Sequence, residues 1–317
     1  MPDIREEIGR RLAQGERVAL ATVVATRRSA PRPVGSKLLV SEQGELLGSV
    51  SGGCVESDVA VQAAEVIAGG DPRLLTYGIT DDQAWGIGLP CGGEIDVFVQ
   101  RLEQELPQNG DGALITALEG PRAGQQWFAE VEGSSRVLEL DGEKVFAEVT
   151  GAPPLLVVVG ATDTAEELCR AAKALGWRTE VVDPRPGLVT RERLPSADQL
   201  RVAWPDDLEA SGDTAVVVLT HEERLDVPAL TTALASDAFY VGAIGSRRTQ
   251  AKRRERLLEA GLEEQQLERL AGPAGLDLGA DTPAETAVSI LGEILAVRAG
   301  RSGGRLAERS GPIHATA

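Results

Sequence analysis

Two patterns of hydrophobic and polar residues divide the chain. In its second half, predicted strands, such as the consecutive apolar residues 155–159 and the segment 178–182, alternate with stretches of helical spacing, such as 163–175. Continuous apolar runs are typical of strands that are buried on both faces, as in parallel sheets. Strands that alternate with helices therefore predict an α/β fold with a Rossmann-like, doubly wound parallel sheet in this half.

The remaining elements of the second half extend this alternation. The pattern predicts strands at 214–219 and 239–241 and helices at 228–235, 247–260 and 282–298. The last helix has the clearest start, because Thr282-Pro283-Ala284-Glu285 combines a capping box with proline at the first helical position.

The first half predicts a mixed α/β domain. Expected here are a helix at 3–14, a strand at 18–25, a hairpin of 37–41 with 45–50, a helix to about residue 68, strands at 73–79 and 94–100, and short strands to about residue 149. Gly151-Ala152-Pro153-Pro154 indicates a boundary. We therefore expect domains at 1–152 and 153–300, and a flexible tail at 301–317 rich in Gly, Ser and Arg.

Composition and charge narrow the function classes. Of 317 residues, 42% are hydrophobic and 26% charged, as in an ordinary globular protein. A net charge of −17 and only 3% aromatic residues argue against binding to nucleic acid or to anionic membranes. The N-terminus lacks the apolar run of a signal peptide and no run is long enough for a membrane span, so a cytoplasmic protein is expected, with a homodimer as the default assembly.

Two of the three cysteines have unusual neighbours. Cys54 follows Gly52-Gly53 at the start of a predicted helix, and Cys91 precedes Gly92-Gly93. Glycines let a ligand approach the backbone closely, and amides at a helix start favour a thiolate, so we interpret the pair as a site. The alternative is that both are small buried side chains, which is our interpretation of Cys169. Three cysteines and two histidines are a poor supply for a closed zinc site.

Three further places are candidates for binding an anion. A loop carries the bases Arg27, Arg28, Arg32 and Lys37 without an acid. The stretch 242–246, which ends in Gly245 and Ser246 before Arg247, resembles an anion-binding amide nest that leads into a helix. His221 follows a predicted strand at the edge where ligands of open α/β sheets gather. Each has a structural alternative: a solvated loop, a tight turn and a capping residue. The bases Lys252, Arg253, Arg254 and Arg256 are interpreted as a solvated helix face.

The first Rossmann-like strand ends in a modified dinucleotide loop. The stretch Gly160-Ala161-Thr162-Asp163 has threonine where the second glycine of the fingerprint should let the backbone meet a pyrophosphate. Asp183 stands where a ribose-binding acid is expected. An NAD(P) site and a helix simply capped by Thr162 or Asp163 both remain open, with the capped helix favoured.

These motifs together resemble the XdhC/CoxI family of molybdenum-cofactor maturation proteins. The resemblance rests on Ser51-Gly52-Gly53-Cys54-Val55-Glu56, Cys91-Gly92-Gly93, Leu219-Thr220-His221, the stretches 240–248 and 275–280, and Thr282–Ile290. The family usually has Gly-Ala-Gly-His at the position of Gly160–Asp163, so a nucleotide role of the second domain is in doubt.

The resemblance implies an accessory chaperone without turnover of its own. Family members bind molybdenum cofactor, support its sulfuration and insert it into an apo-molybdenum hydroxylase of the xanthine or carbon monoxide dehydrogenase type; a cysteine desulfurase is a further expected partner. Cys54 and Cys91 would contact molybdenum or its sulfur, and the glycines, bases and His221 named above would hold a molybdopterin or its cytidine dinucleotide form. An NAD(P)-dependent oxidoreductase and a cofactor-free protein–protein adaptor are the alternatives.

Overall fold

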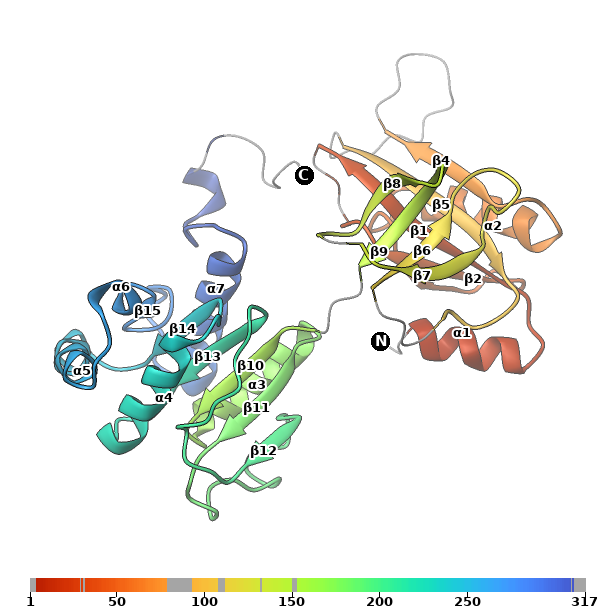
Figure 1. The fold of residues 1–317 in the computed structure, drawn as a ribbon. Helices are drawn as coiled ribbons and strands as arrows, with labels where there is room; N and C mark the ends of the chain where they lie inside the picture. The colour runs from red at the N-terminus through yellow and green to blue at the C-terminus, as the bar shows by residue number, and fades with distance from the viewer. Residues whose placement is uncertain are drawn as a thin grey trace. The chain divides into compact units, whose positions relative to one another are not determined.

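A computed structural model describes residues 4–28, 30, 32–78, 93–107, 112–131, 133–149, 153–308 and 310. These residues belong to two compact units, one within Met1–Gly151 that also includes Ser310, and one spanning Ala152–Glu308. Both units combine helices and strands, and each has its own buried core (Figure 1). Within the described ranges, no helix is both long enough and apolar enough to cross a membrane.

The first unit is built on a five-stranded antiparallel sheet with the order β3-β2-β1-β5-β4. Its strands are β1 (Val18–Arg27), β2 (Lys37–Ser41), β3 (Leu46–Gly48), β4 (Arg73–Tyr77) and β5 (Glu94–Leu102). Alternate residues of β1 face opposite sides: Ala19, Ala21 and Val23 share a core with helix α2 (Glu56–Ile67), and Val18 and Leu20 share another with helix α1 (Ile4–Ala13). Burial on both faces explains why this antiparallel strand has a continuous apolar sequence.

A second, four-stranded sheet completes the first unit. Its order is β7-β6-β9-β8, formed by β6 (Ala113–Ala117), β7 (Gln126–Ala129), β8 (Arg136–Leu140) and β9 (Glu143–Val149). Asp141 and Gly142, both with positive φ, turn β8 into β9, as the sequence Asp-Gly predicts for a two-residue hairpin. Phe146 of this sheet shares a buried cluster with Val24 and Phe98 of the first sheet.

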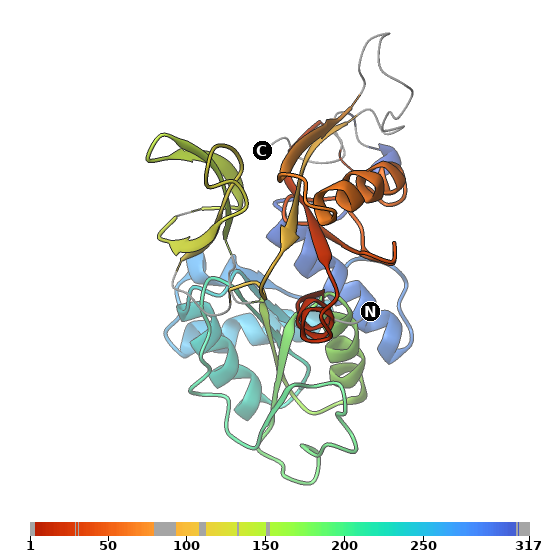
Figure 2. The same cartoon turned by 90° about the vertical axis from the view of Figure 1, so that its right-hand side faces the viewer.

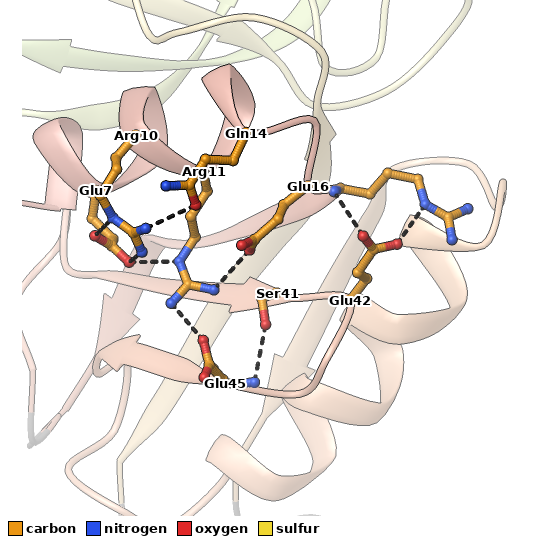
Figure 3. Close-up of polar contacts among 9 residues, drawn as sticks. Glu7, Arg10, Arg11, Gln14, Glu16, Ser41, Glu42 and Glu45 are labelled. Carbon is orange, nitrogen blue, oxygen red and sulfur yellow. Dashed lines mark hydrogen bonds and ion pairs between the residues drawn. The ribbon is translucent and has the colours of Figure 1, made fainter.

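Arginine–carboxylate contacts attach α1 to the β2–β3 hairpin (Figure 3). The Arg11 guanidinium lies 2.6 Å from Glu7, 3.0 Å from Glu16 and 2.6 Å from Glu45, with only 11% of its side chain exposed. Hydrogen bonds from Arg10 and Arg11 lower the pKa of Glu7 to about 2. The helix is thus held by charged groups as well as by Ile8 beneath it.

The second unit contains a six-stranded, wholly parallel sheet. Helices lie on either side of it (Figures 1 and 2). The strand order is β12 (Gln199–Arg201), β11 (Arg178–Val182), β10 (Leu155–Val159), β13 (Thr214–Val218), β14 (Tyr240–Ala243) and β15 (Leu270–Ala271). Leu156 and Val158 face a core formed with α3 (Asp163–Ala174) and α7 (Pro283–Arg298), and Val157 and Val159 face a core formed with α4 (Glu223–Ala235) and α5 (Arg247–Glu259). This strand order, with helices on both faces, confirms the Rossmann-like prediction.

One helix boundary was predicted wrongly. The sequence pattern placed this helix at 228–235, but α4 begins at Glu223 with Pro228 inside it. The short elements β12, β15 and α6 (Glu264–Leu267) were not predicted, because two to four residues carry too little periodicity.

The capping box of α7 is formed as the sequence predicts. The Thr282 hydroxyl accepts from the Glu285 amide at 3.2 Å, and the Glu285 carboxylate accepts from the Thr282 amide at 2.9 Å. Replacing Thr282 with alanine should lower the free energy of unfolding by about 1 kcal/mol in urea denaturation, because the Glu285 amide loses its cap. Thr286→Ala, in the first turns of the same helix, is the matched control and should leave stability unchanged or raise it. Equal losses in both variants would contradict the capping role of Thr282.

Candidate functional site

The loop that precedes α2 is organised around one carboxylate. Glu56 is the first residue of α2, and its two oxygens accept six hydrogen bonds from residues 49–53, which we call the Glu56 loop. The donors are the hydroxyls of Ser49 (2.6 Å) and Ser51 and the amides of Val50 (3.2 Å), Ser51 (2.9 Å), Gly52 (3.0 Å) and Gly53 (2.8 Å). The carboxylate therefore accepts hydrogen bonds from Gly53 and from each of the four residues that precede it.

Ser51 connects this carboxylate to Cys54. The Ser51 hydroxyl donates to Glu56 and accepts from the amides of Cys54 and Val55, both at 2.9 Å. Val55 is buried and is the N-cap residue of α2, so Cys54 lies just before the helix and not within its first turn. The Cys54 side chain is exposed, and its thiol is free. The loop thus fixes the backbone of a cysteine whose side chain faces solvent.

Two glycines make this loop conformation accessible. Gly52 and Gly53 have φ values of +77° and +110°, where residues with a Cβ are strained. Their amides point to Glu56, and among the described residues no atom beyond the chain neighbours lies within 4 Å of the place where a Cβ would stand. Glycine is therefore required here by the backbone conformation, and the open space leaves room for a ligand beside Cys54.

Hydrogen bonding keeps Glu56 ionised. Burial opposes the charged form, but the hydroxyls of Ser49 and Ser51 and the loop amides outweigh it and lower the pKa of Glu56 to about 2. The loop consequently holds a full negative charge at neutral pH.

Two of the four bases predicted to form an anion-binding loop are engaged by acids. Arg27 pairs with Glu94 and, at 2.9 Å, with Asp96, and Lys37 pairs with Glu148. Arg28 and Arg32 are exposed and have no acidic partner among the residues that the structure describes. The sequence could not show these pairings, because the acids come from β5 and β9, far along the chain.

The second cysteine of the predicted site is Cys91. Cys91 and Gly92 lie outside the described residues, and Gly93 is buried immediately before β5. Among the residues that are described, no three His, Cys, Asp or Glu side chains gather as metal ligands do. Cys169 is buried in α3, and desolvation raises the pKa of its thiol to about 12, in keeping with its interpretation as a core residue.

The modified dinucleotide loop of the second unit is closed by its own residues. The Thr162 hydroxyl caps α3 by accepting from the Ala165 amide at 3.2 Å. Asp183 is fully buried; its oxygens accept from the Ala161 amide (3.0 Å) and from the Arg185 amide (2.9 Å), Nε (2.8 Å) and Nη2 (2.6 Å). Four donors occupy the four acceptor positions of the Asp183 carboxylate. Arg185 and the Ala161 amide thus take the positions from which a ribose hydroxyl would donate. This geometry favours the capped-helix interpretation over an NAD(P) site.

His221 and the basic helix α5 line the same pocket. His221 is exposed and borders a pocket of about 250 Å³ together with Arg248, Lys252 and Arg256. Ser246 caps α5 by accepting from the Thr249 amide at 3.2 Å, and Gly245, at φ +128°, makes the turn before it. Arg247, the first residue of α5, is exposed.

Arg253 corrects the prediction of a solvated face on α5. Only 3% of its side chain is exposed; it lies 2.6 Å from Asp226 of α4 and donates to the Ile244 carbonyl (3.0 Å) and to Gln250 (2.7 Å). Helical spacing alone gave no sign of this, because the burial comes from the packing of α4 on α5. Arg254 and Arg256 are exposed and pair with Glu264 and Glu223.

The fold and these sites define a two-domain α/β protein with an N-terminal cysteine loop and a C-terminal Rossmann-like domain. Comparison with known families matches residues 11–78 to the XdhC and CoxI family and residues 156–294 to the XdhC Rossmann domain. The chain belongs to the XdhC and CoxI family, which confirms the resemblance seen in its motifs.

Relatives match nearly the whole chain. A Bacillus subtilis (strain 168) protein, named as a probable xanthine dehydrogenase subunit, is 28% identical over 320 residues, covering 90% of this chain and 95% of its own length. The molybdenum cofactor insertion chaperone PaoD of Escherichia coli (strain K12) is 28% identical over 298 residues, covering 90% and 85%. A crystal structure described as a xanthine dehydrogenase from Bacillus halodurans covers 96% of this chain and 98% of its own, with a TM-score of 0.72 and 24% identity, which supports the fold.

Proposed function

We propose that this protein is a maturation chaperone that binds molybdenum cofactor as cargo, supports its sulfuration and inserts it into a molybdenum hydroxylase. The observation that carries the proposal is the exposed thiol of Cys54 on a loop ordered by Glu56 and Ser51. Thiolate is a soft ligand suited to molybdenum or to its labile sulfur. The names of two relatives, a molybdenum cofactor insertion chaperone and a probable xanthine dehydrogenase subunit, support the same role.

Other groups of the first unit suit such a cargo. Gly52 and Gly53 allow a ring or a phosphate to approach the backbone beside Cys54. Arg28 and Arg32 are the bases of the loop left without acidic partners among the described residues, so they are the best candidates to meet a phosphate. Cys91 is proposed as the second thiol. The partners are an apo-molybdenum hydroxylase and a cysteine desulfurase, and the chaperone acts as a homodimer in the cytoplasm.

Purification under anaerobic conditions from a host that makes molybdenum cofactor tests the cargo. We expect molybdenum and pterin bound near one per chain in the wild type and a loss of at least about tenfold in Cys54→Ala with Cys91→Ala, because the soft ligands are removed. Cys169→Ala is the matched control, since that thiol is buried in the second unit, and it should load normally.

The outcome separates the proposal from its alternatives. No bound cofactor in the wild type, under conditions where a known carrier loads, would overturn the cargo role and favour a protein–protein adaptor. Normal cofactor loading by the double cysteine variant would show that the two thiols are not part of the cofactor site. An oxidoreductase would have to bind NAD(P) in calorimetry, although Thr162 caps α3 and Asp183 is already hydrogen-bonded to Arg185.

A further inference from the structure

The pocket beside His221 carries a positive charge that the fold leaves unbalanced. Two acids line this pocket, and each pairs with an arginine that also lines it: Asp226 with Arg253 at 2.6 Å and Glu223 with Arg256 at 2.9 Å. Arg248 and Lys252 also line it and have no acidic partner among the described residues. The pocket therefore has a local charge of about +2 in a chain whose net charge is −17.

The placement of these bases opposes helix stability. Arg248, Lys252 and Arg256 are spaced four residues apart, so like charges lie above one another on one face of α5. The first turn of α5 contains no acid, although the positive end of a helix dipole favours acids. A bound anion would relieve both unfavourable interactions.

The floor of the pocket is rigid. Asp226 accepts from Thr220 as well as from Arg253, and Arg253 also donates to the Ile244 carbonyl that follows β14. Both buried charges are therefore fixed by several hydrogen bonds, while the bases at the rim are exposed. This geometry is preorganised for an incoming group and does not have to form around it.

We propose that this pocket binds the phosphate or pyrophosphate group of a small ligand. A volume of about 250 Å³ is below that of a pocket which encloses a drug-sized molecule, so only the anionic part of the ligand would be enclosed. Arg248 supplies a planar guanidinium that contacts two phosphate oxygens at once, and Lys252 supplies a point charge one turn further along α5. Thr249 also lines the pocket and carries a hydroxyl.

Calorimetric titration of the full-length apoprotein with pyrophosphate tests the site. We expect saturable binding by the wild type and binding at least about tenfold weaker in Arg248→Gln with Lys252→Gln, because two charge-assisted contacts are lost. Arg254→Gln is the control: it removes one positive charge from the same helix at a residue that does not line the pocket, and its affinity should match the wild type.

A second measurement uses only the wild type, so it does not depend on how the variants fold. Pyrophosphate should protect Lys252 from acetylation by acetic anhydride, read by mass spectrometry, and should not protect the exposed Lys173 of α3. No saturable binding of pyrophosphate, equal affinity in the double variant, or equal labelling of Lys252 with and without ligand would each overturn the proposal.

Titrations with ADP and CDP identify the source of the phosphate. Affinity well above that of pyrophosphate would show that the ligand is a nucleotide whose base and ribose lie outside the pocket. Equal affinity would show that the phosphates alone are recognised. Because neither titration requires molybdenum cofactor, failure of this proposal and failure of the chaperone role are separate results.

Discussion

Replacing Arg253 with alanine is expected to lower the free energy of unfolding of the second unit by about 3–5 kcal/mol. The substitution leaves Asp226, whose side chain is only 7% exposed, as a buried charge without its cation, and uncompensated buried charges are among the costliest defects in a core. It also removes donors from the Ile244 carbonyl and from Gln250. Urea denaturation of the purified variant measures the loss.

The neighbouring residue provides the control. Arg254 pairs with Glu264 at the surface, so Arg254→Ala should cost less than about 1 kcal/mol. In a double-mutant cycle, Asp226→Ala with Arg253→Ala should cost clearly less than the sum of the two single variants, because neither charge is then left alone. Additive losses, or a loss at Arg253 no greater than at Arg254, would refute the buried pair as a stabilising unit.

Replacing Glu56 with alanine is expected to disorder the loop that carries Cys54 and to lower stability by about 2 kcal/mol. Four backbone amides and two serine hydroxyls lose their common acceptor, and only water can replace it. Hydrogen exchange should show the amides of Gly52 and Gly53 exchanging much faster than in the wild type. Glu65→Ala, which removes a surface carboxylate from the same helix, should leave this exchange unchanged.

The same carboxylate predicts how stability depends on pH. The folded-state pKa of Glu56, about 2, lies below its ordinary value of 4.5, so its contribution is fully present above about pH 4.5 and is lost as the pH falls toward 2. The stability difference between the wild type and Glu56→Ala should therefore be constant from pH 5 to pH 7 and should shrink below pH 4.5. A difference that grows on acidification would contradict this assignment.

Much of the fold could be predicted because its signals are local. The run Leu155–Val159 and the capping box at Thr282 are each decided within a few residues, and the structure places a strand and a helix start there. The start of α4 was misplaced: proline is usual in the first turn of a helix, whereas Pro228 lies inside α4. The helix begins at Glu223, and its Asp226 contacts Arg253 of α5, a contact that the local sequence does not reveal.

The candidate site could be predicted only where its chemistry is local as well. The spacing of three residues from Gly53 to Glu56 allows the carboxylate to reach back to the loop, but it does not reveal that six donors converge on it. Pairings across long stretches of chain, such as Lys37 with Glu148 or Arg253 with Asp226, depend on tertiary structure. The sequence therefore did not show which basic residues pair with acids in the folded protein.

The hydrogen bonds to Glu56 also have a consequence for binding kinetics. Because an internal anion already satisfies the amides of residues 50–53, the loop beside Cys54 loses its conformational freedom when the protein folds and not when a ligand arrives. Association at Cys54 should then need no loop rearrangement, so its rate should be set by encounter and orientation. Differences in affinity among ligands of this loop should accordingly arise from differences in their dissociation rates.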